Sequence, residues 1–349
     1  MVRNEEKYME YMLDVTPRLL AVDSPTGFTK NAAAFVKKEL EDLGYQPEIT
    51  RKGSVLVNLG GDDTEDAILL EAHLDTLGGM VAEVKDNGRL RLTNLGGMNA
   101  NNAEAENCRV YTRSGKVYEG TFQLINPSIH VNGDYNKIER SYETMELVLD
   151  ERVQSRAETE ELGISAGDIV GFEPRTRITE SGYIKSRFLD DKLSVGIILG
   201  FAKYLKDEQI QHKRAVYVHI TTYEEVGHGG SAGVPEGVTE AISVDMGCVG
   251  DGLTCREHQV SICAKDSGGP YDYEVVGKLI DAAKRMEADY AVDIYPHYGS
   301  DVEATLRAGY DVRHGLIGAG VYASHGYERS HKDGMRHTWR TLIGYCTEE

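Results

Sequence analysis

The sequence predicts an α/β fold with a mixed sheet that is interrupted by an inserted all-β domain. At both ends of the chain, short apolar runs alternate with amphipathic segments of helical period, whereas the middle alternates with period two between turn residues. A chain of 349 residues also exceeds one small core and fits two domains of unequal size. We therefore expect a discontinuous α/β domain, residues 1–76 and 179–349, and a barrel-like inserted β domain, residues 77–178.

The first α/β segment begins with two amphipathic helices. Residues 5–20 and 31–43 carry apolar side chains at spacings of three and four, which is the helical period. Pro17 interrupts the first helix near its end, and Gly44 follows the second as a stop signal. Two short apolar runs come next and are expected to form buried strands: residues 55–59 and 67–72.

The middle of the chain favours β-hairpins. Residues 81–95 alternate around Asp86-Asn87-Gly88, and residues 108–120 alternate around Ser114-Gly115. Short strands continue to about residue 178, and we expect no helix in this block. The α/β pattern then resumes, with expected helices at 191–206, 273–287 and 329–345 and expected strands at 214–223, 241–244 and 315–319.

The composition argues against several classes of function. Lys and Arg total 38 against 57 Asp and Glu, a formal net charge of −19, so the chain lacks the broad basic face that nucleic acids and anionic membranes require. No apolar run approaches the about 18 residues of a membrane span, and residues 1–15 lack the apolar stretch of a secretory signal. Five scattered cysteines without a CxxC pair argue against disulfides and against a thiolate zinc site. We expect a cytoplasmic protein.

Histidine and acidic residues gather where predicted strands end. In open α/β sheets, ligands bind outside the carboxyl ends of the strands, so these side chains are expected to converge on one rim. They are His73 with Asp75, the pair Asp190-Asp191 after the insertion, the pair Glu224-Glu225, Asp245 and His325. Imidazole and carboxylate suit catalytic zinc or cobalt, and two ions about 3.5–4 Å apart need a carboxylate that bridges them. Each motif alone has an ordinary explanation, such as a helix cap or a solvated pair, but their order and placement favour a two-metal site.

Seven motifs together resemble the glutamyl and deblocking aminopeptidase family, which includes the tetrahedral aminopeptidases. They are SPTGF (24–28), EAHLD (71–75), FLDDK (188–192), YEEVG (223–227), SVDMG (243–247), YGSD (298–301) and SHGYE (324–328). The resemblance covers nearly the whole chain and implies a di-metal exopeptidase catalytic domain with the inserted β domain as a dimerisation domain. It also implies a homodimer and allows further assembly into a tetrahedral dodecamer that encloses the active sites.

The resemblance implies a role for each residue of the rim by matching position. The implied ligands are His73, Asp190 and Asp245 for one divalent ion and Asp190, Glu225 and His325 for the other. Zinc or cobalt is expected, and manganese also suits these ligands. Glu224 would be the general base, and Asp75 would orient the far ring nitrogen of His73. The implied activity is metal-dependent removal of N-terminal residues from peptides by a hydroxide that bridges the two ions.

Further positions are expected to line the substrate cleft. Asp301 resembles a family position there, and His228 and His297 are expected to be additional substrate contacts. His331 competes with His325 as the last metal ligand, but it lacks the glutamate that follows in the family, so we prefer His325.

Most remaining histidines are expected to be structural or exposed, and His219, within a predicted strand, is expected to be a core histidine with a hydrogen-bond partner. The sequence departs from the family pattern at Thr76, at Lys192 and at residues 326–328, so we assign no side-chain specificity.

Four other functions are alternatives to a peptidase. Residues 229–233 match the G-x-S-x-G elbow of serine hydrolases around Ser231, but Val234-Pro235 cannot cleanly start the helix that the elbow needs. A glucanase-like hydrolase needs two carboxylates about 5–9.5 Å apart and leaves the metal ligands unexplained. A non-catalytic scaffold would be expected to have lost Glu224 or a ligand. A di-metal deacylase of N-acylated amino acids or peptides would use the same metals and base, and it is the main alternative.

Overall fold

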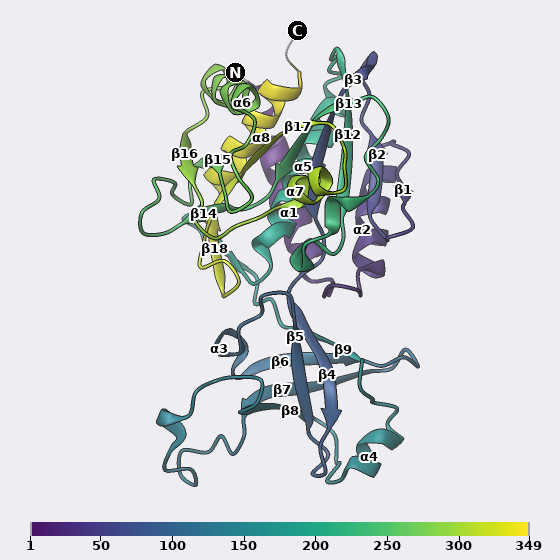
Figure 1. Ribbon diagram of the computed structural model, residues 1–349, viewed down its shortest axis with the longest axis vertical. Coiled ribbons are helices and arrows are strands. Elements are labelled where there is room, and N and C mark those ends of the chain that lie inside the picture. The colour runs from purple at the N-terminus through teal and green to yellow at the C-terminus, as the bar shows by residue number, and fades with distance from the viewer. Residues whose placement is uncertain (1, 348–349) are drawn as a thin grey trace.

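The computed structural model describes residues 2–347 and consists of two parts joined by a narrow neck (Figure 1). The α/β body lies above the neck in Figure 1 and contains both described ends of the chain, and an all-β barrel lies below it. The chain enters the barrel after β3 (Asp63–His73) and returns to the body before β10 (Arg177–Ile178). The predicted fold class is confirmed, and the domain limits at 77 and 178 stay a prediction.

A large mixed sheet forms the centre of the body, in the order β1-β2-β12-β3-β13-β17-β18-β11-β10. Four neighbouring strands in it are parallel: β12 (Arg214–Thr221), β3, β13 (Val238–Val244) and β17 (Arg313–Tyr322). These strands contain long runs of buried residues, as expected of parallel strands that are covered by helices. Because they are parallel, their carboxyl ends lie at one edge, and that edge faces the neck because β3 leads into the barrel.

The remaining strands of the body flank this centre and pair mostly in antiparallel fashion. They are β1 (Glu48–Ile49), β2 (Val55–Asn58), β10, β11 (Tyr183–Ser186), β14 (Gly247–Val249), β15 (Val260–Lys265), β16 (Tyr290–Ile294) and β18 (Glu328–His331).

Six helices pack around the sheet: α1 (Glu5–Leu20), α2 (Lys30–Asp42), α5 (Leu189–Asp207), α6 (Tyr273–Arg285), α7 (Asp301–Arg307) and α8 (Lys332–Cys346). In Figure 1, α7 lies in front of the sheet and α1 and α5 lie behind it. α1, α5 and α8 meet at a cluster of aromatic rings, where Trp339 stacks on Tyr8 at a centroid distance of 5.6 Å and meets Tyr204 edge-on at 5.3 Å. This cluster fixes α5, whose first turn carries Asp190.

The inserted part is a closed antiparallel barrel in the order β4-β5-β8-β7-β6-β9. Its strands are β4 (Gly78–Val84), β5 (Leu90–Leu95), β6 (Glu106–Tyr111), β7 (Val117–Leu124), β8 (Met145–Leu149) and β9 (Ile169–Phe172). Phe122 and Phe172 meet edge-to-face in its core, with ring centroids 5.9 Å apart. Closure pairs each of these strands on both sides, so the barrel does not depend on the body for strand partners.

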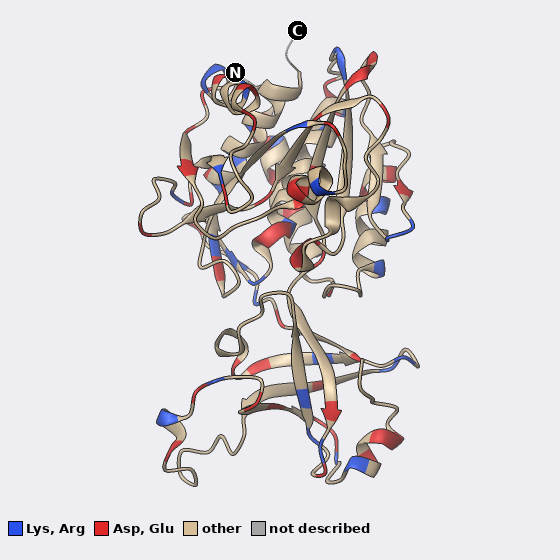
Figure 2. Ribbon diagram, in the orientation of Figure 1, with Lys and Arg blue, Asp and Glu red and all other residues tan. Residues whose placement is uncertain are grey.

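Charged side chains of both signs are spread over the body and the barrel (Figure 2). One group of them joins the two parts near the neck. Arg109 of β6 donates two hydrogen bonds to Asp23 in the body, and its Nη1 lies 2.7 Å from Glu173. Among residues 2–347, no helix is both long and apolar enough to cross a membrane.

Both predicted hairpins are confirmed, since β4 pairs with β5 and β6 pairs with β7. The expectation of no helix in this block is wrong: α3 (Ala100–Ala103), η1 (Tyr135–Lys137) and α4 (Arg156–Glu161) lie within it. These helices are too short to show a helical period. α4 does carry a local start signal, because the Ser155 hydroxyl accepts a hydrogen bond from Glu158 N.

Two predictions about helices are also corrected, one about where a helix begins and one about an interruption at Pro17. The helix expected at 329–345 begins at Lys332, because the residues before it form β18 and pair with β11 and β17. His331 instead caps this helix, as its Nδ1 accepts a hydrogen bond from Asp333 N. Pro17 does not interrupt α1, which continues to Leu20, because a proline so near the end removes little of the hydrogen-bond ladder.

Candidate metal centre

The candidate ligands lie just beyond the carboxyl ends of the parallel strands. His73 is the last residue of β3, and Asp245 directly follows β13. β12 leads into η2 (Glu224–Val226), and β17 leads into the turn that carries His325. The sheet therefore brings together side chains that are far apart in the sequence.

His73, Asp190 and Asp245 form a first group at this edge. One ligand atom from each lies within 4.8 Å of the others, and the Nε2 of His73 is 3.0 Å from Asp190 Oδ1. All three side chains are buried. Asp190 enters the group from the start of α5, where the Asp190–Asp191 peptide bond is cis.

Asp190, Glu225 and His325 form a second group, which shares Asp190 with the first. The Nε2 of His325 lies 3.6 Å from Asp190 Oδ2 and 3.5 Å from Glu225 Oε2. The two oxygens of Asp190 thus point to different groups: Oδ1 faces His73 and Oδ2 faces His325. This is the geometry expected of a bridging carboxylate.

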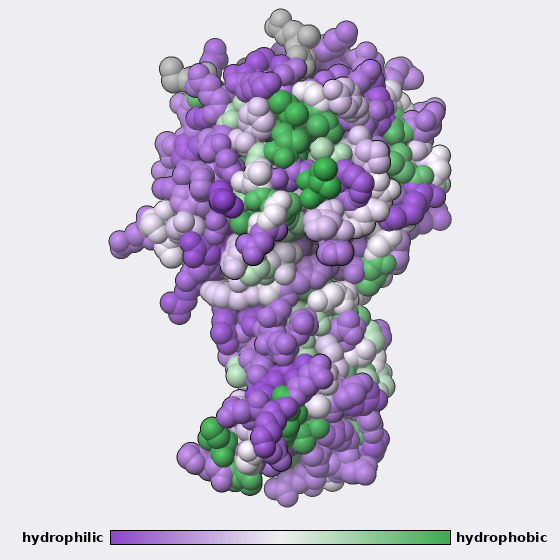
Figure 3. Space-filling model, turned by 60° about the vertical axis from the view of Figure 1, so that its left-hand side comes forward, coloured by the Kyte–Doolittle hydropathy of each residue, from purple (hydrophilic) through white to green (hydrophobic). Residues whose placement is uncertain are grey.

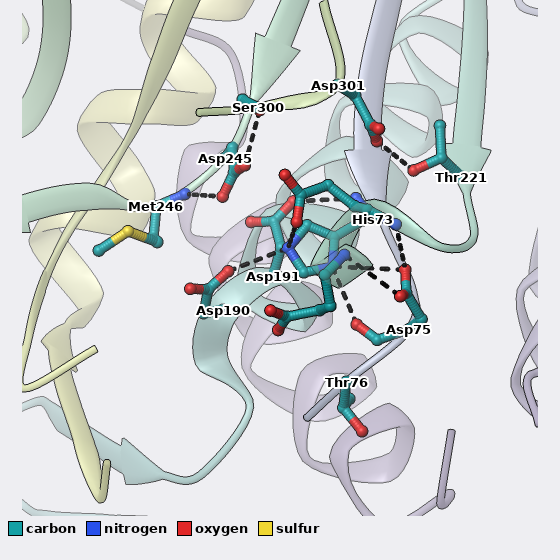
Figure 4. A network of polar contacts seen from close by, with 12 residues as sticks. His73, Asp75, Thr76, Asp190, Asp191, Thr221, Asp245, Met246, Ser300 and Asp301 are labelled. Carbon is teal, nitrogen blue, oxygen red and sulfur yellow. Dashed lines mark hydrogen bonds and ion pairs between the residues drawn. The ribbon is translucent and has the colours of Figure 1, made fainter. Parts of the chain in front are cut away.

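Hydroxyl and main-chain donors fix the carboxylates of the first group (Figure 4). Ser300 Oγ donates to Asp245 Oδ2 at 2.7 Å, and Met246 N donates to Asp245 Oδ1 at 2.6 Å. Ser324 Oγ donates to Asp190 Oδ2 at 3.1 Å. These bonds orient the carboxylates towards His73.

Asp75 acts differently from the sequence-based expectation. The Nδ1 of His73 lies 2.9 Å from the main-chain carbonyl of Asp75 but 3.8 Å from its carboxylate, so the backbone orients the ring. A carbonyl can only accept, so Nδ1 carries a proton, and Nε2 is the nitrogen that faces Asp190. The Asp75 carboxylate instead accepts from Glu224 N at 3.1 Å, Glu225 N at 3.4 Å and Thr26 Oγ1 at 2.7 Å. It thereby holds the start of η2 in place.

Burial and mutual repulsion dominate the electrostatics of the cluster. Burial and the neighbouring carboxylates raise the pKa of Glu224 and the pKa of Glu225 well above the ordinary value. Burial and the charge of Asp190 raise the pKa of Asp245 to about 6. For His73, burial opposes the charged ring, but the surrounding carboxylates raise its pKa well above the ordinary value.

The cluster fits a pair of divalent ions. Glu225 Oε1 is buried and has no hydrogen-bond partner within residues 2–347. Buried carboxylates that crowd together are costly unless a cation pairs with them, and imidazole with carboxylate is a donor set that zinc, cobalt and manganese accept. Two ions, one in each group, would satisfy these oxygens and relieve the repulsion.

A cavity of about 550 Å³ opens over both groups. Beyond the ligands, its lining includes Glu224, Met246, Cys248, His297, Tyr298 and Arg307. The Tyr298 hydroxyl donates to the Met246 carbonyl at 3.0 Å, which fixes this wall. The cavity is large enough to hold the end of a peptide.

The other sequence-predicted contacts fall in different places. His297 is exposed at the cavity wall, whereas His228 is exposed outside this lining and stacks on Tyr223 at 5.1 Å. Asp301 reaches the cavity but is 3% exposed, and its carboxylate accepts hydrogen bonds from Gly230 N and Thr221 Oγ1. Its side chain is therefore engaged within the protein.

His219 is buried as expected, with Nδ1 3.1 Å from Glu71 Oε1. His331 caps α8, and its Nε2 lies 2.8 Å from the Ser181 carbonyl. The structure thus brings His325, not His331, to the cluster.

Ser231 is not arranged as a nucleophile. It ends η3 (Gly229–Ser231), and the extended Ala232 follows where the elbow needs a helix. Its hydroxyl donates to the His228 carbonyl at 2.8 Å, and Lys52 Nζ lies 3.1 Å from it.

Glu328 is a residue next to the candidate ligands for which sequence patterns predicted no role. It is buried, and its carboxylate accepts from Asp190 N and His325 N, each at 3.0 Å. It thereby ties two candidate ligands together through their main chains. Its position at the end of the SHGYE motif was the one signal that could have found it.

Comparisons with known proteins identify relatives of this chain in sequence and in fold. The chain is 43% identical over 333 residues to the Bacillus subtilis (strain 168) protein named "Putative aminopeptidase YhfE", covering 95% of this chain and 96% of that protein. The solved aminopeptidase APDkam598 from the archaeon Desulfurococcus kamchatkensis is similar with a TM-score of 0.86 and 20% identity, over 99% of this chain and 96% of that one.

The TET1 peptidase of Pyrococcus horikoshii, described as able to assemble into a tetrahedron or a large octahedral shell, has a TM-score of 0.84 at 19% identity, over 97% of this chain and 100% of that one. These structural likenesses show the shared fold. Residues 53–340 also match the sequence family described as M42 glutamyl aminopeptidase. Given this match and a near full-length relative at 43% identity, the chain belongs to the M42 glutamyl aminopeptidase family.

Proposed function

We propose that this M42 peptidase is a two-metal aminopeptidase that removes N-terminal residues from peptides. One observation carries the proposal: two ligand groups share Asp190 and border one cavity, with Glu224 beside them. A shared carboxylate with two further ligands for each ion is the arrangement that two-metal hydrolases use. Zinc and cobalt are the proposed metals, and manganese also suits the ligands.

Each of the two ligand groups would bind one metal ion. His73, Asp190 and Asp245 would hold one ion, and Asp190, Glu225 and His325 would hold the other. Two divalent ions, when bound, would lower the pKa of water towards neutrality and polarise the scissile carbonyl. The Asp75 carbonyl keeps the proton of His73 on Nδ1, so Nε2 stays available.

Glu224 is the proposed general base. Its Oε2 lies 3.7 Å from His73 Nε2, and its side chain is 15% exposed at the cavity. It borders the first group without belonging to either group. Its carboxylate would accept a proton from the attacking water and deliver that proton to the nitrogen of the leaving amine.

We also propose that the chain forms a homodimer through the barrel and that dimers assemble into a tetrahedral dodecamer. Hydrophobic patches interrupt a largely hydrophilic surface on both parts of the molecule (Figure 3). On the barrel part, Val117, Ile125, Ile129 and Val131 are exposed. Exposed apolar groups of this kind favour an interface, and the assembly described for the TET1 peptidase supports the larger form.

A Glu224→Gln variant tests the mechanism. We expect kcat to fall by about 10²–10⁴-fold, because the amide cannot accept the proton, while two ions still bind. Glu236→Gln is the matched control, since Glu236 is an exposed glutamate in the segment that follows η3. Hydrolysis by Glu224→Gln at the wild-type rate would contradict the assignment of Glu224.

A substrate panel tests the activity itself. Chelator-treated protein is assayed on free and N-acetylated aminoacyl-anilides with zinc, with cobalt and without added metal. Metal-dependent hydrolysis of the free-amine substrates alone is expected. Hydrolysis of the acetylated substrates alone would indicate the deacylase instead, and the absence of any hydrolysis would contradict both.

A further inference from the structure

A short segment of the barrel part lies directly against the second ligand group. It runs from Gly96, after β5, to Asn102 in α3, which lies close to the neck in Figure 1. A Cβ added to Gly96 would lie 3.1 Å from the Cβ of Glu225. A Cβ added to Gly97 would lie 2.5 Å from His325 Nδ1 and 2.9 Å from His325 Cε1. The imidazole ring therefore rests on the bare α-carbon of Gly97.

The turn that carries His325 needs support, because its backbone is unusual. His325 has a φ of +62° and Ala323 has a φ of +59°, in the left-handed region that few non-glycine residues adopt. The main chain of His325 is held at both ends: its N–H donates to Glu328 at 3.0 Å, and its carbonyl accepts from Asn102 Nδ2 at 2.9 Å. The second of these bonds comes from the barrel part.

Asn102 is itself anchored to the segment that carries the bridging carboxylate. Its main-chain carbonyl accepts a hydrogen bond from Arg187, which is 4% exposed and lies three residues before Asp190. The same guanidinium binds Glu106 of the barrel and, at 3.0 Å, the Glu173 carbonyl. One connected set of contacts thus joins the barrel to the segments that carry two ligands of the second group.

We propose that Gly97 and Asn102 are positioning residues for the second metal subsite, so that the barrel completes the catalytic centre. The inference rests on the proposed two-metal function. Gly97 sets the plane of the His325 ring by leaving room for it, and Asn102 holds the strained backbone behind that ring. Side chains that orient a ligand in this way typically alter metal affinity by about 10–100-fold when they are removed.

Titration of the metal-free protein with Co²⁺, followed by visible absorption and by calorimetry, tests the proposal. The wild type is expected to bind two ions. Asn102→Ala and Gly97→Ala are each expected to weaken one of the two binding events by about 10–100-fold and to leave the other unchanged. Asn101→Ala is the matched control, because it removes the neighbouring exposed asparagine of α3, whose side chain makes no hydrogen bond within residues 2–347.

The outcomes separate this inference from the proposed function. Binding of both ions by Asn102→Ala and Gly97→Ala with wild-type affinities would overturn the positioning role alone. Equal weakening of both ions, together with a lower Tm of the metal-free variants, would also overturn it, because that pattern indicates a general loss of structure. A wild type that binds fewer than two ions would overturn the two-metal function itself.

Discussion

Asp301 connects three segments behind the candidate ligands. Its carboxylate accepts from Gly230 N at 2.6 Å and from the Thr221 hydroxyl, and it heads α7. A Cβ on Gly229 would lie 2.2 Å from Asp301 Oδ1, so the close approach of this carboxylate requires a glycine there. Asp301 thus holds η3, the turn that follows the one bearing Glu224. At the scale of single residues, the cleft depends on buried carboxylates such as Asp301 as well as on the candidate ligands.

Replacement of Asp301 distinguishes a role in positioning from contact with substrate. Asp301→Ala is expected to destabilise the protein by about 1–3 kcal/mol, because Gly230 N would lose its buried acceptor, and to lower kcat by displacing the turn. Asp301→Asn keeps an acceptor for Gly230 N and is expected to restore stability and activity. Thermal unfolding and steady-state kinetics measure both effects. A raised KM in Asp301→Asn with unchanged stability would show instead that the charge of Asp301 contacts the substrate.

At the scale of elements, Glu240 connects β13 to the strands and helices around it. It is fully buried, and it accepts hydrogen bonds from Arg214 of β12 at 2.6 Å, Lys278 of α6 at 2.8 Å and Tyr345 of α8 at 2.7 Å. Arg313 of β17 lies 2.7 Å from it. Burial opposes the charge of Glu240, but these donors lower its pKa to about 2. One carboxylate thus holds together the end of the sheet away from the metal centre.

The acid sensitivity of folding should reflect this carboxylate. Since its pKa is lower in the folded state, Glu240 stabilises the fold above the ordinary glutamate pKa, and this stabilisation is lost as the pH falls through about 2. Glu240→Gln is expected to lower the free energy of unfolding at pH 7 by about 1.5–3 kcal/mol, and the difference from wild type should shrink towards pH 2. Denaturant unfolding across this pH range measures the difference.

Glu274→Gln is the control for this experiment, because the exposed Glu274 also pairs with Arg313, at 3.6 Å. A surface pair of this kind contributes little to stability. If the difference in free energy of unfolding between Glu240→Gln and wild type stayed constant with pH, the result would contradict stabilisation by the charge of Glu240.

Sequence patterns predicted which candidate ligands would lie together where those residues follow recognisable strands. His73 and Asp245 directly follow buried apolar runs, and the parallel pairing of those runs brings their ends together. Glu328 and Asn102 could not be placed in this way, because their contacts join residues 138 and 223 positions apart. The contact between the Asp75 carbonyl and His73 Nδ1 depends on local backbone geometry, which the spacing of residues in the sequence does not reveal. Likewise, α3 and α4 are too short for any period to appear.

At the scale of the whole molecule, the barrel part carries both the proposed assembly surface and the segment that lies against the second ligand group. Residues 125–144 connect β7 and β8 and carry the most exposed large apolar side chains of the barrel part, Ile129 at 61% and Val131 at 74%. Gly97 and Asn102, in contrast, lie on the side of the barrel part that contacts His325 of the body. We keep residues 77–178 as the proposed extent of this domain.

The oligomeric state should depend on this apolar segment. Ile129→Asp combined with Val131→Asp is expected to shift the protein to monomers, since charges would be buried in the proposed interface. Ile294→Asp, which alters an exposed residue of β16 in the body, is expected to leave the dimer intact. Light scattering after size-exclusion chromatography measures the mass of each species. A wild-type-sized assembly in the double variant would contradict dimerisation through this segment.

The contact between Gly97 and His325 also limits how the two parts can be recombined. A chimera that received the barrel of a relative would receive that relative's wall of the second metal subsite, even if both parts folded well. To exchange the assembly surface and keep the proposed metal subsite, the transferred segment would have to begin after Asn102. Alternatively, Gly97 and Asn102 would have to be restored in the chimera by mutation. If the proposal holds, the inserted part contributes to the metal centre through Gly97 and Asn102, so it could not be exchanged without regard to that centre.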